Sequence, residues 1–164
     1  MIKLGYFSFL VLVLLACANQ DSNDMNEALE EMTMQIQESA KIVGVECIGQ
    51  PNNYTLNVSI LSPDTGCDQY ADWWEVITPS GELIYRRILA HSHVNEQPFT
   101  RSGGTVDVGP TDTIIIRAHM NNLGYGTQIY RGIVLDNAMI QDSLPMDFAE
   151  ELQTTDPLPE DCAF

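Results

Sequence analysis

From Lys41 onward, apolar and polar side chains alternate with a period of two residues. The stretch NYTLNVSIL, residues 53–61, is the clearest case, because large apolar side chains occupy every second position: Tyr54, Leu56, Val58 and Ile60. A period of two places successive side chains on opposite faces of a β-strand. The chain from Lys41 onward is therefore restricted to strands with one buried face, in sheets that must cover one another.

Further strand signals follow at intervals of about ten residues. Two apolar runs flank the turn Pro79-Ser80-Gly81, TVDV at residues 105–108 is a short strand, and TIIIRAHM at residues 113–120 is a β-branched strand. About seven strands result, without a helix between them. We predict an all-β fold, an antiparallel immunoglobulin- or fibronectin III-like β-sandwich over residues 41–140, with a jelly roll or cupin-type barrel as the alternative.

The segments on either side of this domain have different patterns. In residues 17–40, Asp24 and Glu27 have the spacing of a capping box. Apolar residues follow at helical steps: Met25, Leu29, Met32 and Ile36. We expect a short amphipathic helix that acts as a spacer. Residues 141–164 form an acidic tail interrupted by proline, with a helical turn expected at 148–152 and weak order over the last ten residues.

The N-terminus has the form of an export signal. One lysine precedes an apolar stretch, residues 4–16, that is too short for a permanent membrane span. The sequence Leu14-Leu15-Ala16-Cys17 resembles the lipobox of bacterial lipoproteins. The resemblance implies that residues 1–16 are a signal peptide, that Cys17 carries the acyl chains, including palmitate, and that the protein is anchored in the cell envelope, in the outer rather than the inner membrane. Cleavage after Ala18 would instead give a secreted protein.

The charge of the chain limits its partners. The formal net charge is -16, and loss of Lys3 with the signal leaves six basic residues against 23 acidic ones. Such a chain repels nucleic acid phosphates and anionic lipid headgroups. Nucleic acid is therefore not an expected partner, and the expected membrane contact is the N-terminal lipid anchor.

The cysteines predict one disulfide. With Cys17 used by the anchor, an odd number remains for an oxidising compartment: Cys47, Cys67 and Cys162. We expect the pair Cys47–Cys67, with Cys162 left over in the tail. The other two pairings stay open, because spacing alone does not determine connectivity.

The histidines form a candidate metal site. His91 and His93 lie two residues apart and share a face in a strand, and His119 lies on the more polar face of residues 113–120. If the strands are neighbours, three imidazoles and the Glu96 carboxylate could hold zinc, copper, manganese or iron. The order of these residues in HSHVNEQPFTRSG and beyond resembles the metal motifs of cupins, although the P-x-G of the second motif is absent. The resemblance implies a metal at His91, His93, Glu96 and His119.

Charged residues crowd the same region and favour two other interpretations. The basic ones are Arg86, Arg87, Arg101 and Arg117, and the acidic ones just upstream are Asp64, Asp68, Asp72 and Glu75. Such a set is typical of internal ion pairs in a structural polar cluster. It also suits an anionic or carbohydrate ligand.

The tandem tryptophans Trp73 and Trp74 point to opposite faces of a strand, so one of them could be an exposed platform for a sugar ring. We expect a ligand-binding surface with these residues: Trp73, Trp74, Asp68, Asp72, Arg87 and Arg101. The usual catalytic motifs are absent from the sequence, so an enzyme is not the first expectation. The expected function is an exported, lipid-anchored module that binds a glycan, a peptide or a protein of the envelope. The alternative is a metal-binding protein or a cupin-like metalloenzyme.

Overall fold

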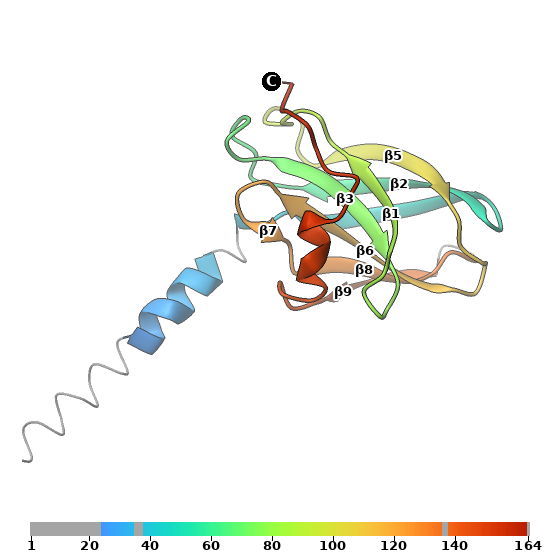
Figure 1. The fold of residues 1–164 in the computed structure, drawn as a ribbon, viewed down its shortest axis with the longest axis horizontal. Coiled ribbons are helices and arrows are strands. Elements are labelled where there is room, and N and C mark those ends of the chain that lie inside the picture. Colours follow the sequence, from blue (N-terminus) through green and yellow to red (C-terminus); the bar gives the residue numbers. More distant parts are fainter. Residues whose placement is uncertain (1–23, 35–37, 136–137, 164) are drawn as a thin grey trace, which may run out of the picture. The chain divides into compact units, whose positions relative to one another are not determined.

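The computed structural model describes residues 24–34, 38–135 and 138–163. The chain divides into two units, Met1–Gln37 and Glu38–Phe164. In the first unit, residues 24–34 form a helix, which confirms a short helix before the sandwich, while its role as a spacer stays a prediction (Figure 1). Ile36 and the lipobox with Cys17 lie outside the described residues. Within the described residues, no helix has the length and apolar character needed to cross a membrane.

The second unit is an antiparallel β-sandwich (Figure 1). Its smaller sheet has the strand order β1-β2-β5, and its larger sheet has the order β4-β3-β6-β8-β9, with β7 paired to β6. The strands are β1 (Lys41–Gln50), β2 (Asn53–Leu61), β3 (Ala71–Ile77), β4 (Leu83–Ile88), β5 (Phe99–Val106), β6 (Thr113–Met120), β7 (Gly124–Tyr125), β8 (Gln128–Ile133) and β9 (Met139–Ser143). The predicted all-β sandwich is thus confirmed, while its immunoglobulin-like character stays a prediction.

Alternation in the sequence decides which side chains enter the core between the sheets. The apolar face of β2 is buried there, as predicted, together with every second residue of β6: Ile114, Ile116, Ala118 and Met120. In β1 the register shifts between Ile42 and Gly44, so that Ile42 is fully buried and Val43 only partly. The bulge changes the phase of an otherwise regular pattern.

Strand β5 is longer than the short strand predicted for residues 105–108. It begins at Phe99 and contains Gly103, a residue that weakens the strand signal in a sequence. A Cβ atom on Gly103 would lie 2.7 Å from Cζ2 of Trp74 and 2.7 Å from the hydroxyl of Tyr85. Because Trp74 of the larger sheet reaches across the core to the backbone of β5, only glycine fits at this position.

The outer face of the larger sheet is also covered. All seven residues of β3 are buried, since the C-terminal segment, residues 144–157, lies across the sheet (Figure 1). This segment contains a 3-10 helix, η2 (Glu150–Thr154), close to the predicted helical turn. The weak order expected for the last ten residues is wrong. Arg86 binds the carbonyls of Thr155 and Pro157, and the Ala163 N–H donates to the Ala90 carbonyl at 2.6 Å.

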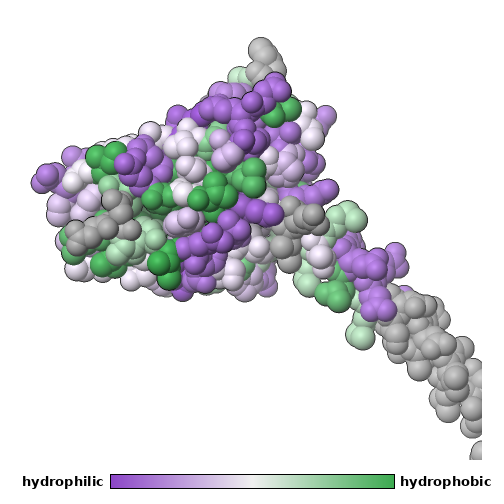
Figure 2. Space-filling view, turned by 180° about the vertical axis from the view of Figure 1, so that it is seen from behind, coloured by the Kyte–Doolittle hydropathy of each residue, from purple (hydrophilic) through white to green (hydrophobic). Residues whose placement is uncertain are grey.

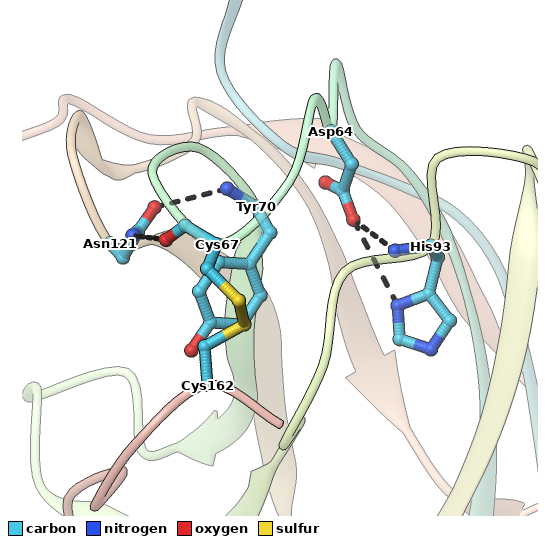
Figure 3. The surroundings of a disulfide bond; sticks show 6 residues. All are labelled: Asp64, Cys67, Tyr70, His93, Asn121 and Cys162. Carbon is cyan, nitrogen blue, oxygen red and sulfur yellow. Dashed lines mark hydrogen bonds and ion pairs between the residues drawn. A yellow bond between two sulfur atoms is a disulfide. The ribbon is translucent and has the colours of Figure 1, made fainter. Parts of the chain in front are cut away.

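The disulfide joins Cys67 to Cys162, so the predicted Cys47–Cys67 pairing is wrong (Figure 3). Cys67 lies in an exposed loop before β3, where the chain's end reaches it. Cys47 lies on β1, and its side chain packs against the core between the sheets. Burial, with the nearby charge of Glu46, raises the pKa of the Cys47 thiol to about 11.

The surface of the sandwich is mixed. Figure 2 shows one face, on which apolar residues lie between polar ones. The exposed large apolar side chains of this unit include Ile48, Leu135 and Ile140. Scattered apolar residues of this kind are normal on protein surfaces.

Candidate functional site

Charged side chains form a buried network on the outer face of the larger sheet. Glu75 of β3 is at its centre and is fully buried. Its Oε2 accepts from Arg86 of β4 at 2.6 Å, and its Oε1 pairs with Arg117 of β6 at 2.8 Å. The expected structural polar cluster therefore exists, and the alternation of β3 and β6 places these residues on one face.

The two arginines also donate hydrogen bonds to the C-terminal segment. Arg86 donates to the main-chain carbonyls of Leu152, Thr155 and Pro157. Arg117 donates to the carbonyls of Phe148 and Ala149. The network thus holds the C-terminal segment to the sheet and leaves no guanidinium of this pair open to an outside ligand.

His119 belongs to the same covered face. Its Nδ1 lies 2.7 Å from Oδ1 of Asp72, and its ring is stacked on Trp73 at 3.6 Å between centroids. Its Nε2 lies 3.4 Å from Oε1 of Gln153 in η2. His119 is therefore enclosed by protein groups on both ring nitrogens.

The predicted metal set of His91, His93, Glu96 and His119 is not brought together. In the described ranges, no group of three or more histidine, cysteine, aspartate or glutamate side chains is placed to hold a metal ion. The reason is that His119 faces the C-terminal segment, whereas His93 stacks on Phe99 of the smaller sheet at 3.8 Å. The cupin-like constellation is thus divided, with His119 on β6 of the larger sheet and the other three residues in the connection between β4 and β5.

Two loops line an open pocket of about 380 Å³ beside the disulfide. We call it the histidine pocket. Its lining residues are Gly66, Cys67, His91, Ser92, His93, Val94, Asn95 and Glu96. His91 and His93 lie in the connection between β4 and β5 rather than in a strand, and their ring centroids are 4.6 Å apart. The pocket therefore unites the predicted histidine pair with Glu96.

His93 is the buried member of the pair. Its backbone N–H donates to Oδ2 of Asp64 at 2.7 Å, and its Nδ1 lies 3.9 Å from the same oxygen (Figure 3). Burial, followed by the charges of Arg101 and His91, lowers the pKa of His93. Neither ring nitrogen of His93 has a hydrogen-bond partner within the described residues, and the same holds for the buried Ser92 hydroxyl.

Asp64 fixes the geometry of both loops. Its Oδ1 accepts hydrogen bonds from the Ser62 hydroxyl at 2.6 Å and from the Ala71 N–H at 3.0 Å. Its Oδ2 accepts a hydrogen bond from the His93 N–H. From the sequence, Asp64 is expected only as one of the acids near the arginines. Its position in the turn sequence SPDTG is the signal for a carboxylate that binds backbone N–H groups.

The remaining predicted ligand residues have mixed outcomes. Trp73 and Trp74 are 3% and 0% exposed, so neither is a platform for a sugar ring, and Asp72 is buried against His119. Arg101 is paired with Glu96 at 2.8 Å, which lowers the pKa of Glu96. Arg87 and Asp68 remain exposed. The prediction of a ligand-binding surface that includes Trp73 and Trp74 is therefore wrong for the two tryptophans.

Comparison with known proteins gives one partial likeness. The chain is 42% identical over 73 residues to a protein of Halomicrobium mukohataei named "Putative lipoprotein". The match covers 44% of this chain and 35% of that protein, so the chain spans about a third of the length of this relative. No family model matches the chain. No solved structure matches it either.

Proposed function

We propose that this chain is a lipid-anchored protein of the cell envelope whose sandwich domain binds a small polar ligand in the histidine pocket. The anchor is supported by the lipobox resemblance at Cys17 and by the name of the Halomicrobium protein. The anchor and the pocket are separate parts of the proposal and are tested separately.

The unpartnered groups of His93 and Ser92 carry the ligand part of the proposal. A buried polar group without a hydrogen bond costs about 1–3 kcal/mol, so a ligand that reaches these groups would gain affinity from the hydrogen bonds that it supplies. The volume of about 380 Å³ lies in the range of small-molecule sites. A sugar unit of a glycan or a polar side chain of a peptide fits this description best.

Replacement of Cys17 tests the anchor. Wild-type protein is expected to partition into detergent and to incorporate labelled fatty acid in the producing cell. Cys17→Ser is expected to lose the label and to appear in the aqueous phase. Equal labelling of the two forms would contradict the anchor.

Calorimetric titration of the full chain tests the pocket, with envelope saccharides and short polar peptides as probes. We expect saturable binding by the wild type and binding at least about tenfold weaker in His91→Ala, which removes an exposed imidazole of the pocket. The control is Gln141→Ala on β9, which is also exposed and lies outside the histidine pocket. Equal affinities of His91→Ala and wild type would exclude this pocket as the site.

A second candidate function is binding of a transition metal by the histidine pair. The adjacent imidazoles support it, because a lowered pKa keeps His93 neutral and neutral imidazole is the form that binds metals. Elemental analysis of protein purified without an affinity tag decides the question. Stoichiometric zinc, copper, manganese or iron that disappears in His91→Ala would favour the metal over the polar ligand.

A further inference from the structure

The end of the chain contacts both loops of the histidine pocket. We call residues 158–163 the C-terminal tail. Cys162 is bonded to Cys67, which lines the pocket (Figure 3). The Ala163 N–H donates to the carbonyl of Ala90, the residue before His91. The C-terminal tail therefore bridges one loop to the other at the edge of the pocket.

The Cys67 loop has its own anchors. The Asn121 side-chain amide donates to the Cys67 carbonyl at 2.8 Å, and its carbonyl oxygen accepts from the Tyr70 N–H at 3.0 Å. Gly66 and Gln69 form an isolated β-bridge within the loop. None of these contacts of the Cys67 loop involves the disulfide or the C-terminal tail.

The other loop is held differently at its two histidines. His93 is fixed by Asp64 and by the stack on Phe99. Upstream, the Leu89 N–H donates to the Asp72 carbonyl at 2.8 Å. Between these two points the Ala90 carbonyl accepts from Ala163, so the C-terminal tail contacts the backbone directly beside His91.

We propose that the C-terminal tail is a redox-sensitive clamp that sets the position of His91 in the histidine pocket. With the Cys67–Cys162 bond closed, Ala163 is held against Ala90 and His91 stays beside His93. With the bond open, the tail leaves Ala90 and His91 moves, while His93 stays on Asp64. The effect on ligand affinity rests on the proposed function, whereas the movement of His91 does not.

The opening step is a thiol–disulfide exchange. A dithiol reductant attacks one sulfur of the Cys67–Cys162 bond, the S–S bond breaks, and a second attack within the mixed disulfide releases both cysteines as thiols. Two electrons and two protons pass to the protein, and the reductant becomes a disulfide. Cys67 is exposed and Cys162 is half-buried, so the bond is open to attack from solvent.

The three histidines of the chain give a direct test without any ligand. Carbon–proton NMR of the full chain records one ring signal per histidine, and assignment uses His91→Gln and His93→Gln. On reduction with dithiothreitol, and in Cys162→Ser, the His91 signal is expected to shift and to narrow. The His93 and His119 signals are expected to stay in place, since Asp64 and Asp72 hold their residues.

A second variant tests the hydrogen bond from Ala163 to Ala90 separately from the disulfide. Because it retains the disulfide, it also controls for loss of the fold. A chain that ends at Cys162 keeps the disulfide but lacks the Ala163 N–H, and its His91 signal is expected to shift in the same direction. An unchanged His91 signal after reduction would overturn the clamp, and so would an equal shift of all three histidines. A His91 shift without any ligand binding would retain the clamp and reject the proposed function.

Discussion

His93 combines burial, an aromatic stack and two ring nitrogens without hydrogen bonds among the described residues. A side chain selected for stability alone would be apolar at such a position, because phenylalanine keeps the stack and removes the unsatisfied atoms. The unpartnered nitrogens of His93 are the residue-scale argument for a ligand.

His93→Phe is therefore expected to stabilise the domain by about 1 kcal/mol while it abolishes ligand binding. Urea denaturation measures the first effect and calorimetric titration the second. Phe99→Leu is the control, because it removes the stack and leaves the nitrogens in place; it is expected to destabilise by about 1 kcal/mol. A loss of stability in His93→Phe would show that the nitrogens have partners in solution.

The same residue predicts a pH dependence. The pKa of His93 is lowered from its ordinary value of 6.5, so the unfolded chain takes up more protons than the folded chain as the pH falls below about 6.5. The folded state is expected to lose stability in this window and to regain it above pH 6.5. Urea midpoints between pH 5 and pH 8 measure the slope, and the difference between wild type and His93→Phe isolates the histidine from the carboxylates. Equal slopes in the two proteins would contradict the lowered pKa.

At the scale of elements, the outer face of β3, β4 and β6 is covered by the C-terminal segment, which is bound there through two arginines. Five main-chain carbonyls of that segment bind two arginines, and both arginines bind Glu75. A carboxylate that neutralises two buried cations cannot be removed without leaving uncompensated charge in the protein.

We expect Glu75→Gln to destabilise the domain by about 3–5 kcal/mol and to make the C-terminal segment sensitive to protease. Urea denaturation and limited proteolysis with mass mapping are the measurements. The matched control is Glu82→Gln on the exposed turn between β3 and β4, for which a change within about 0.5 kcal/mol is expected. Similar losses in both variants would mean that Glu75 is not the centre of the network.

The sequence predicts those strands and turns whose structure depends on the residues within the element itself. The faces of β2 and β6 follow from alternation, and the turn at Pro79 follows from its residues. The cover over Trp73 depends on residues 144–157, far along the chain, and the length of β5 depends on how Trp74 meets Gly103. The histidine pair is recognised by its spacing, but its separation from His119 follows from the path of the connection between β4 and β5, which the local pattern does not determine.

At the scale of the whole molecule, one covalent bond closes most of the domain into a loop. Cys67 and Cys162 are 95 residues apart, and a loop of that length contributes about 4–5 kcal/mol through the unfolded state. Cys162→Ser is expected to lower the free energy of unfolding by up to this amount in urea denaturation. Cys47→Ser keeps the bond and serves as the control. An equal decrease in the free energy of unfolding in the two variants would show that the disulfide is not the cause.

The position of Cys162 near the end of the chain also orders events during synthesis. Ribosomes make the chain from its N-terminus, so Cys47 and Cys67 exist before the partner of the native bond does. Until residues 144–163 emerge, Glu75, Arg86 and Arg117 face water and Cys67 can be oxidised only with the wrong cysteine. A cell that folds this protein efficiently must therefore delay oxidation until Cys162 is delivered, or provide an isomerase that undoes the early bond.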